Sequence, residues 1–413
     1  MSPGQAALLF LGGLFPLMAL AYMLGRRRVL AFGSGPPLHS RPGFYGWYAV
    51  VWLALPALAV ALAASLLQLL GLATPPASMT LTASLLVAAG GLALAMRSVH
   101  PALRARNIVE AVVRWLLLAA SLVSILTTLG IIFSILFEAI RFFQVVSLWE
   151  FLTGTTWSPD TAFLGGAGRG AEGKAQAEFG SVPLFAGTFM ITAVAMAVAL
   201  PVGLLSAIYM SEYAPTKVRS AAKPTLEVLA GIPTVVYGFF AAITVSPLVV
   251  QAATAVGLEA SYSNALAPGV VMGVMIIPFV SSLSDDVISA IPQSMREGSF
   301  ALGATPSETI KHVLLPAALP GVVAAFILAV SRALGETMIV VMAAGLRPNL
   351  TANPLEDMTT VTVRIVDALT GDQEFDSPET LSAFGLGLVL FIVTLALNMI
   401  SVYVVRRFHE KYE

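Results

Sequence analysis

The sequence predicts an all-α integral membrane protein with about nine transmembrane helices. Of the 413 residues, 57% are hydrophobic and only 11% are charged, whereas soluble domains average roughly 45–50% apolar and about 25% charged residues. Apolar runs of about 20 residues, the length of helix that crosses the hydrocarbon core of a bilayer, recur along the chain. Lys and Arg are concentrated in alternate connections between these runs, as in proteins whose cytoplasmic loops carry the positive charge.

Nine apolar runs are candidates for membrane spans. The third is short, and the second contains Pro56. An odd number of spans places the two chain ends on opposite sides of the membrane. The runs are Gln5–Leu24, Trp47–Leu72, Met79–Met96, Val112–Phe137, Leu184–Met210, Leu226–Val250, Ala265–Leu283, Gly321–Ala343 and Leu381–Val405.

The distribution of basic residues predicts a periplasmic N-terminus and a cytoplasmic C-terminus. With this orientation, sixteen of the 22 basic residues are cytoplasmic, five are outside and Arg332 lies within a span. The first run has no Lys or Arg before it, unlike a secretory signal, so we expect an uncleaved helix. The cytoplasmic residues are Arg26, Arg27, Arg28, Arg41, Arg97, Arg104, Arg106, Arg114, Lys217, Arg219, Lys223, Arg296, Lys311, Arg406, Arg407 and Lys411; those outside are Arg141, Arg169, Lys174, Arg347 and Arg364.

The composition excludes several kinds of site. A formal net charge of −1 provides no general basic field for nucleic acid. The chain has no cysteine, and its four histidines are scattered singly, so we expect neither disulfides nor a zinc site. We expect no cofactor.

The outside loop, residues 138–183, is rich in glycine and too polar to span the membrane. Within it, Gly168–Ala175 (GRGAEGKA) matches the phosphate-binding loop of ATPases except at its last position, where that loop needs Ser or Thr to bind magnesium. We therefore expect no nucleotide site here. No ATPase domain is visible elsewhere in the sequence, so energy from ATP would come from a partner.

The cytoplasmic loop, residues 284–320, predicts two short helices that meet at an angle. Ser294–Glu297 and Thr305–Glu308 both fit the capping box, in which Ser or Thr and a Glu three residues later satisfy backbone N–H groups. Pro306 suits the first helical position, and Gly303 is expected to end the first helix. Capping alone is equally consistent with an amphipathic loop on the membrane surface.

The residues of this loop resemble the EAA motif of ABC-importer permeases, which docks into a groove on the ATPase. The resemblance rests on Glu297, on Gly303 and on Val313–Pro316 (VLLP). Gly298 and Ser299 stand where the motif usually has two alanines. The residues that this resemblance assigns to ATPase coupling are Glu297, Gly298, Ser299, Gly303, Leu315 and Pro316.

Five further segments resemble the phosphate permeases of the PstC type, over roughly Val112–Glu413. They are Phe151–Pro159 (FLTGTTWSP), Ser211–Pro215 (SEYAP), Glu227–Gly238 (EVLAGIPTVVYG), Arg332–Met338 (RALGETM) and Pro348–Pro354 (PNLTANP).

This resemblance implies a transport subunit without catalysis of its own, in the bacterial inner membrane. Its core would be a type I importer permease of six helices, residues 112–413, and residues 1–111 would be three extra helices of unassigned role. The implied partners are a homologous second permease, two ATPase subunits, a periplasmic phosphate-binding protein, inorganic phosphate and membrane lipid. Transport would proceed by alternating access, driven through the loop at 284–320.

Arg332 and Glu336 are the candidate residues of the substrate path or its gate. A charge in a span is costly and usually faces a cavity or a partner, and a guanidinium offers a planar fork of donors to phosphate oxygens. The spacing places both side chains on one helical face, one turn apart. Two interpretations stay open: the pair takes part in transport, or Glu336 only neutralises Arg332.

Three other functions remain as alternatives. A permease for another oxyanion would share the EAA motif but lack the Arg332–Met338 pattern. The sister permease of the phosphate system has a similar segment, although Met338 and the Phe151 loop favour the PstC type. An ATP-independent secondary transporter would need no nucleotide-binding partner.

Overall fold

The structure, a computed structural model, describes residues 3–32, 37–159, 177–370 and 377–408. Almost all of it is α-helical, which confirms the predicted fold class. The chain divides into two compact units, residues 1–130 and 131–413, and each is described by itself. Among the described residues, eight helices are long and apolar enough to cross a membrane. The ninth expected span lies in helix α1 (Pro3–Leu30).

The first unit packs α1, α2 (Pro42–Leu69) and α3 (Ala77–Ser98) together with the start of α4 (Ala105–Val145). Small residues allow the close approach: a Cβ added at Gly25 would lie 2.6 Å from the carbonyl oxygen of Tyr45. Glycine and alanine at such positions are typical of membrane helix interfaces. Pro56 lies inside α2 without ending it.

In the second unit, α7 (Val182–Ile208) and α11 (Leu266–Ser289) pack along their length. Here too glycine sets the spacing, since a Cβ at Gly273 would lie 2.8 Å from the carbonyl oxygen of Ala195. Helix α14 (Leu315–Leu334) packs against α11, and α17 (Pro378–Phe408) packs against α14. The other elements from α7 onward are η1 (Tyr209–Tyr213), α8 (Thr216–Ala230), α9 (Thr234–Phe240), η2 (Ala241–Val245), α10 (Ser246–Ala255), α12 (Gln293–Ala301), α13 (Pro306–Thr309), η3 (Ile310–Leu314), α15 (Met338–Ala343) and α16 (Val361–Thr370).

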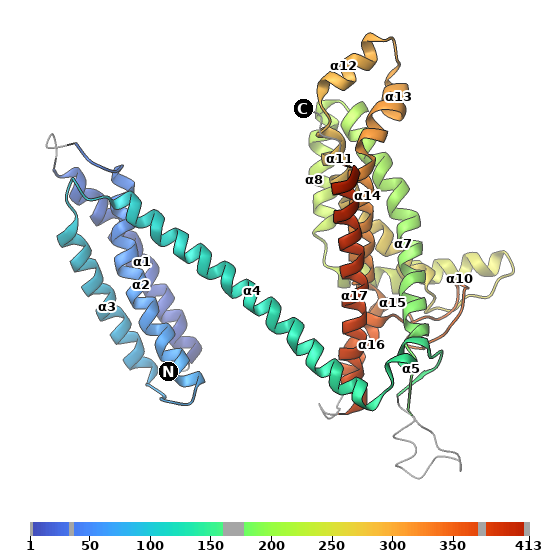
Figure 1. Ribbon diagram of the computed structural model, residues 1–413, viewed down its shortest axis with the longest axis horizontal. Helices are drawn as coiled ribbons and strands as arrows, with labels where there is room; N and C mark the ends of the chain where they lie inside the picture. The colour runs from blue at the N-terminus through green and yellow to red at the C-terminus, as the bar shows by residue number, and fades with distance from the viewer. Residues whose placement is uncertain (1–2, 33–36, 160–176, 371–376, 409–413) are drawn as a thin grey trace. The chain divides into compact units, whose positions relative to one another are not determined.

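The two ends of the second unit differ in structure. Figure 1 shows α12 and α13 at one end and α5 (Leu148–Thr153) at the other. At the α5 end, the short strands β1 (Trp157–Ser158) and β2 (Glu178–Phe179) pair antiparallel. The buried rings of Phe142, Phe151, Trp157 and Phe179 form one aromatic cluster. Phe151 and Trp157, which carried part of the resemblance, therefore hold the hairpin against the bundle. The segment Gly168–Ala175 lies outside the described residues.

Two predicted spans have different boundaries in the structure. The expected span Gly321–Ala343 is interrupted, because α14 ends at Leu334 and α15 begins at Met338. The expected span Leu226–Val250 begins later, at Thr234, after α8 has ended and Pro233 has started a new helix. Proline fixes its own φ and lacks an N–H, so it marks this boundary. The prediction that residues 226–233 belong to the span was wrong.

Candidate functional site

Arg332 lies in the last turn of α14 and is exposed. Its guanidinium carbon is 5.6 Å from the centre of the Phe279 ring of α11, a distance at which an aromatic face attracts a cation. Across the described part of the chain, Arg332 takes part in none of the ion pairs. Its guanidinium N–H groups are therefore available to bind an anionic ligand.

Glu336 does not lie one helical turn beyond Arg332, and this prediction was wrong. The helix ends at Leu334, with Gly335 as its C-terminal cap. The Glu336 carboxylate accepts from the backbone N–H groups of Met338 (3.1 Å) and Ile339 (3.4 Å), at the start of α15. Helix N-termini have free N–H donors that a carboxylate satisfies. Arg332 and Glu336 therefore form no ion pair among the described residues.

A cavity of about 260 Å³ opens beside Arg332. One wall is α8, another is α11, and Arg332 reaches it from α14. Its lining includes both charged and apolar side chains: Met210, Lys223, Leu226, Glu227, Ala230, Met275, Pro278, Phe279, Ser282, Asp285 and Arg332.

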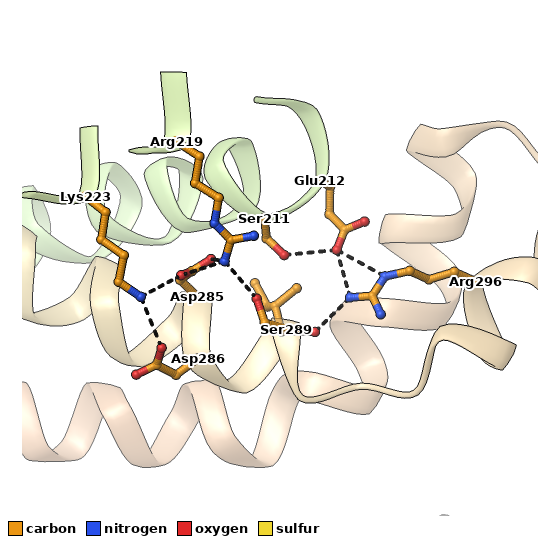
Figure 2. Close-up of polar contacts among 9 residues, drawn as sticks. Ser211, Glu212, Arg219, Lys223, Asp285, Asp286, Ser289 and Arg296 are labelled. Carbon is orange, nitrogen blue, oxygen red and sulfur yellow. Dashed lines mark hydrogen bonds and ion pairs between the residues drawn. The ribbon is translucent and has the colours of Figure 1, made fainter. Parts of the chain in front are cut away.

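At one end of this cavity, Asp285 is almost fully buried and is paired with two cations. Arg219 Nη2 lies 3.1 Å from each carboxylate oxygen, and Lys223 Nζ lies 3.3 Å from Oδ2. Figure 2 shows both cations reaching Asp285 from α8. The hydrogen bond to Asp285 raises the pKa of Lys223 above its ordinary value, because it favours the charged ammonium. These pairs fasten α8, an amphipathic helix, to α11.

Sequence reasoning missed this cluster. It counted Arg219 and Lys223 only as cytoplasmic charge and gave Asp285 no role. A signal was present, because Asp285 and Asp286 are adjacent acidic residues at the end of an otherwise apolar run. Such residues usually pair with one another or with a cation.

The loop between α11 and α14 has the expected bend. Helix α12 ends at Ala301, and Gly303 adopts φ = +84°, a left-handed conformation that favours glycine. Thr305 and Glu308 form the expected capping box at α13, with Pro306 in the first turn. Hydrogen bonds from the backbone and side chain of Thr305 lower the pKa of Glu308.

The second expected capping box, Ser294–Glu297, is absent from this described segment. Helix α12 starts at Gln293 after Pro292, and no side chain caps its N-terminus. Ser294 lies inside the helix, because the fixed φ of Pro292 places the boundary two residues earlier than the pattern suggested.

The residues predicted to couple to an ATPase lie on this bent loop or at the start of α14. Glu297, Gly298, Gly303 and Pro316 are exposed, while Ser299 and Leu315 are half-buried. The neighbouring Phe300 and Leu302 are also exposed, Leu302 at 92%. Exposed apolar side chains at the end of a short helix are suited to insertion into a partner's groove.

Arg296 connects this loop to the transmembrane bundle. Its Nη2 lies 2.9 Å from Oε1 of Glu212, in the turn η1 that follows α7. It also donates to the carbonyl oxygens of Ile291 (2.7 Å) and Ile288 (2.9 Å). Figure 2 shows Arg296 and Glu212 directed toward each other. Both side chains are largely buried, 12% and 14% exposed. The ion pair therefore holds the loop of α12 against the end of α7.

A second, larger cavity of about 1120 Å³ lies among the segments around β1, residues 258–261 and residues 347–357. Its lining is polar and includes Trp157, Arg347, Asn349 and Asn353, residues that fall in or next to the PstC-type segments. Among the described residues no group of three or more His, Asp or Glu side chains is arranged to hold a metal ion.

Two family models match the chain. One is described as the binding-protein-dependent transport system inner membrane component and matches residues 199–412. The other is described as a phosphate ATP-binding cassette transporter and matches residues 13–75. The second match lies in the helices to which the sequence alone assigned no role.

Curated relatives match up to 71% of this chain. The probable ABC transporter permease protein YqgH of Bacillus subtilis is 32% identical, over 71% of this chain and 90% of the relative. The phosphate transport system permease protein PstC 1 of Mycobacterium tuberculosis is 31% identical, over 71% and 92%. The phosphate transport system permease protein PstC of Haemophilus influenzae is 28% identical, over 65% and 86%.

Proposed function

We propose that this chain, which belongs to the family of binding-protein-dependent transport system inner membrane components, is the permease subunit of an ATP-driven importer of inorganic phosphate. Relatives that carry the name phosphate transport system permease support the substrate. So does the match of residues 13–75 to a phosphate ATP-binding cassette transporter model.

The observation that carries the proposal is the position of Arg332. Its guanidinium lines a cavity bounded by the amphipathic helix α8 and by the membrane helices α11 and α14, and it is not committed to a carboxylate among the described ion pairs. A charged side chain in such a place is retained for function rather than stability. The planar fork of the guanidinium can donate two parallel hydrogen bonds to an oxyanion. Phosphate passing through the cavity would replace hydrogen bonds to water by hydrogen bonds to the Arg332 guanidinium.

Glu336 supports the path indirectly. By accepting from the first N–H groups of α15, its carboxylate fixes the break between α14 and α15, which directly follows the helical turn that carries Arg332. Broken helices within a membrane are tolerated where they line a cavity. We therefore assign Glu336 to the gate, as a positioning residue, and Arg332 to the path itself.

The chain supplies geometry and one placed charge, and it performs no covalent chemistry. Residues 112–413 form the transport core, and residues 1–111 are additional helices. The N-terminus is periplasmic and the C-terminus cytoplasmic. A periplasmic phosphate-binding protein delivers substrate, a homologous second permease completes the path, and two ATPase subunits dock on the loop 284–320 through Glu297 and its neighbours.

Substitution of Arg332 by lysine tests this proposal, because lysine keeps the charge but loses the planar fork. We expect assembled complexes whose uptake of labelled phosphate in vesicles is severely reduced. Lys217→Gln, which removes an exposed cation from α8, is the control and should transport normally. Uptake near wild type in Arg332→Lys would show that other residues line the path.

A further inference from the structure

The cavity beside Arg332 contains a carboxylate that the transport mechanism above does not use. Glu227 lies on α8 and lines the cavity. Its side chain is exposed and has no hydrogen bond or ion pair within the described part of the chain. Asp285, the other carboxylate of the lining, has both oxygens occupied by Arg219 and Lys223. Glu227 is thus the carboxylate available to a ligand.

The pairing of α8 with α11 places Glu227 within the cavity. Arg219 contacts Ser289 and Lys223 contacts Asp285, so the two helices run antiparallel, with successive turns of one opposite successive turns of the other. Glu227 lies one turn beyond Lys223 on α8, and it lines the cavity together with Ser282 of α11. The next turn of α11 carries Phe279, against which Arg332 packs. The cavity, about 260 Å³, far exceeds the roughly 10–15 Å³ that one water requires.

We infer that this cavity binds an oxyanion only when the oxyanion carries a proton. Arg332 donates to the unprotonated oxygens of the ligand, and Glu227 accepts the hydrogen bond of its O–H group. An ionised carboxylate can only accept, so it pairs with a protonated oxygen and repels a bare one. Inorganic phosphate retains a proton at neutral pH, whereas sulfate does not. A phosphodiester lipid headgroup also lacks such a proton, so the cavity excludes it.

This inference rests on the proposed function and deepens it, because it identifies the residue that selects phosphate over other oxyanions. Selection of this kind is strong. A protonated oxyanion forms a hydrogen bond to the charged carboxylate, whereas an unprotonated oxyanion is repelled by the same carboxylate. Glu227→Gln is the informative variant. Glutamine has the same size but both donates and accepts, so it tolerates either ligand.

The experiment measures equilibrium binding of labelled phosphate to the assembled transporter in nanodiscs, without the binding protein, in competition with sulfate. We expect sulfate to compete poorly with phosphate in the wild type. In Glu227→Gln the preference for phosphate should fall roughly tenfold or more. Glu150→Gln, an exposed carboxylate without a role here, is the control and should keep the wild-type preference. Arg332→Gln should lose phosphate binding.

Two results would overturn the inference while leaving the proposed function intact. One is an unchanged preference in Glu227→Gln in complexes that bind phosphate. The other is a wild-type complex that imports phosphate in vesicles but binds none in this assay. Failure of the wild-type complex to import phosphate at all would instead refute the proposed function, and the inference with it.

Discussion

Gly303 allows the geometry of the coupling loop to be tested quantitatively. Its φ of +84° lies in the left-handed region, and a Cβ added there would meet no atom within 4 Å. The cost of Gly303→Ala is therefore purely conformational, roughly 1–2 kcal/mol for an L-residue in the left-handed region. Such a change raises the local opening equilibrium of the loop about 5–30-fold.

Gly298 provides a matched control within the same loop. It is also exposed, and a Cβ there would also meet nothing within 4 Å. Gly298 differs because it lies inside α12 and is not among the glycines with positive φ. Alanine in a helix interior is more stable than glycine by roughly 0.5–1 kcal/mol. The two substitutions should therefore have opposite effects.

Hydrogen exchange of the backbone amides of residues 293–314 measures these local equilibria. We expect protection to fall about 5–30-fold in Gly303→Ala and to stay equal or rise in Gly298→Ala. In assembled complexes, Gly303→Ala should also loosen ATPase docking and reduce phosphate uptake per ATP hydrolysed. Unchanged protection in Gly303→Ala, or an equal fall in both variants, would refute the claim that the left-handed turn holds the loop in shape.

Two further predictions concern the same end of the protein and its orientation. Arg296→Gln leaves the largely buried Glu212 without its cation, so we expect ATP hydrolysis to continue while phosphate uptake per ATP falls. The double variant Arg296→Gln with Glu212→Gln should recover assembly of the complex, because an unpaired buried charge is the main cost of the single change. An unchanged ratio of uptake to hydrolysis in Arg296→Gln would contradict the coupling role. Reporter fusions after Lys174 and after Glu413 should lie on opposite sides of the membrane. Finding both reporters on the same side would contradict the nine-span topology.

Most of the fold could be predicted from the sequence because membrane helices have a strong signal. Seven of the nine predicted apolar runs coincide with a single continuous helical segment, since the bilayer requires every backbone group to be hydrogen-bonded within its own segment. The end of a helix is less well specified by hydropathy. Leu334 and Met338 belong to one apolar run in the sequence, yet the structure interrupts the helix between them.

That interruption changed the interpretation of the site. The spacing of Arg332 and Glu336 is typical of an intrahelical pair, but Glu336 binds the N–H groups of the next helix instead. A carboxylate can satisfy free N–H donors as readily as it can pair with a cation, and the sequence does not distinguish these outcomes. The pairs that do form, such as Arg219 with Asp285, join residues far apart in the chain. Their contact depends on helix packing that spacing cannot reveal.

The pattern at Thr305–Glu308 succeeded because a capping box is local: the same few residues provide the donors and the acceptors. Ser294–Glu297 fitted the same pattern and failed, because Pro292 starts the helix earlier. Local patterns therefore predicted the turn chemistry wherever no stronger local constraint competed with them.

The most direct test of the account is ATP-dependent uptake of phosphate by the reconstituted complex. The wild-type chain, with its second permease, two ATPase subunits and the phosphate-binding protein, would be placed in proteoliposomes, and the initial rate of labelled phosphate entry measured with and without ATP on the ATPase side. The account predicts uptake that requires both ATP and the binding protein and that is not driven by an ion gradient alone. Uptake of equal rate without ATP, or ATP-dependent uptake of sulfate or molybdate but not of phosphate, would contradict it.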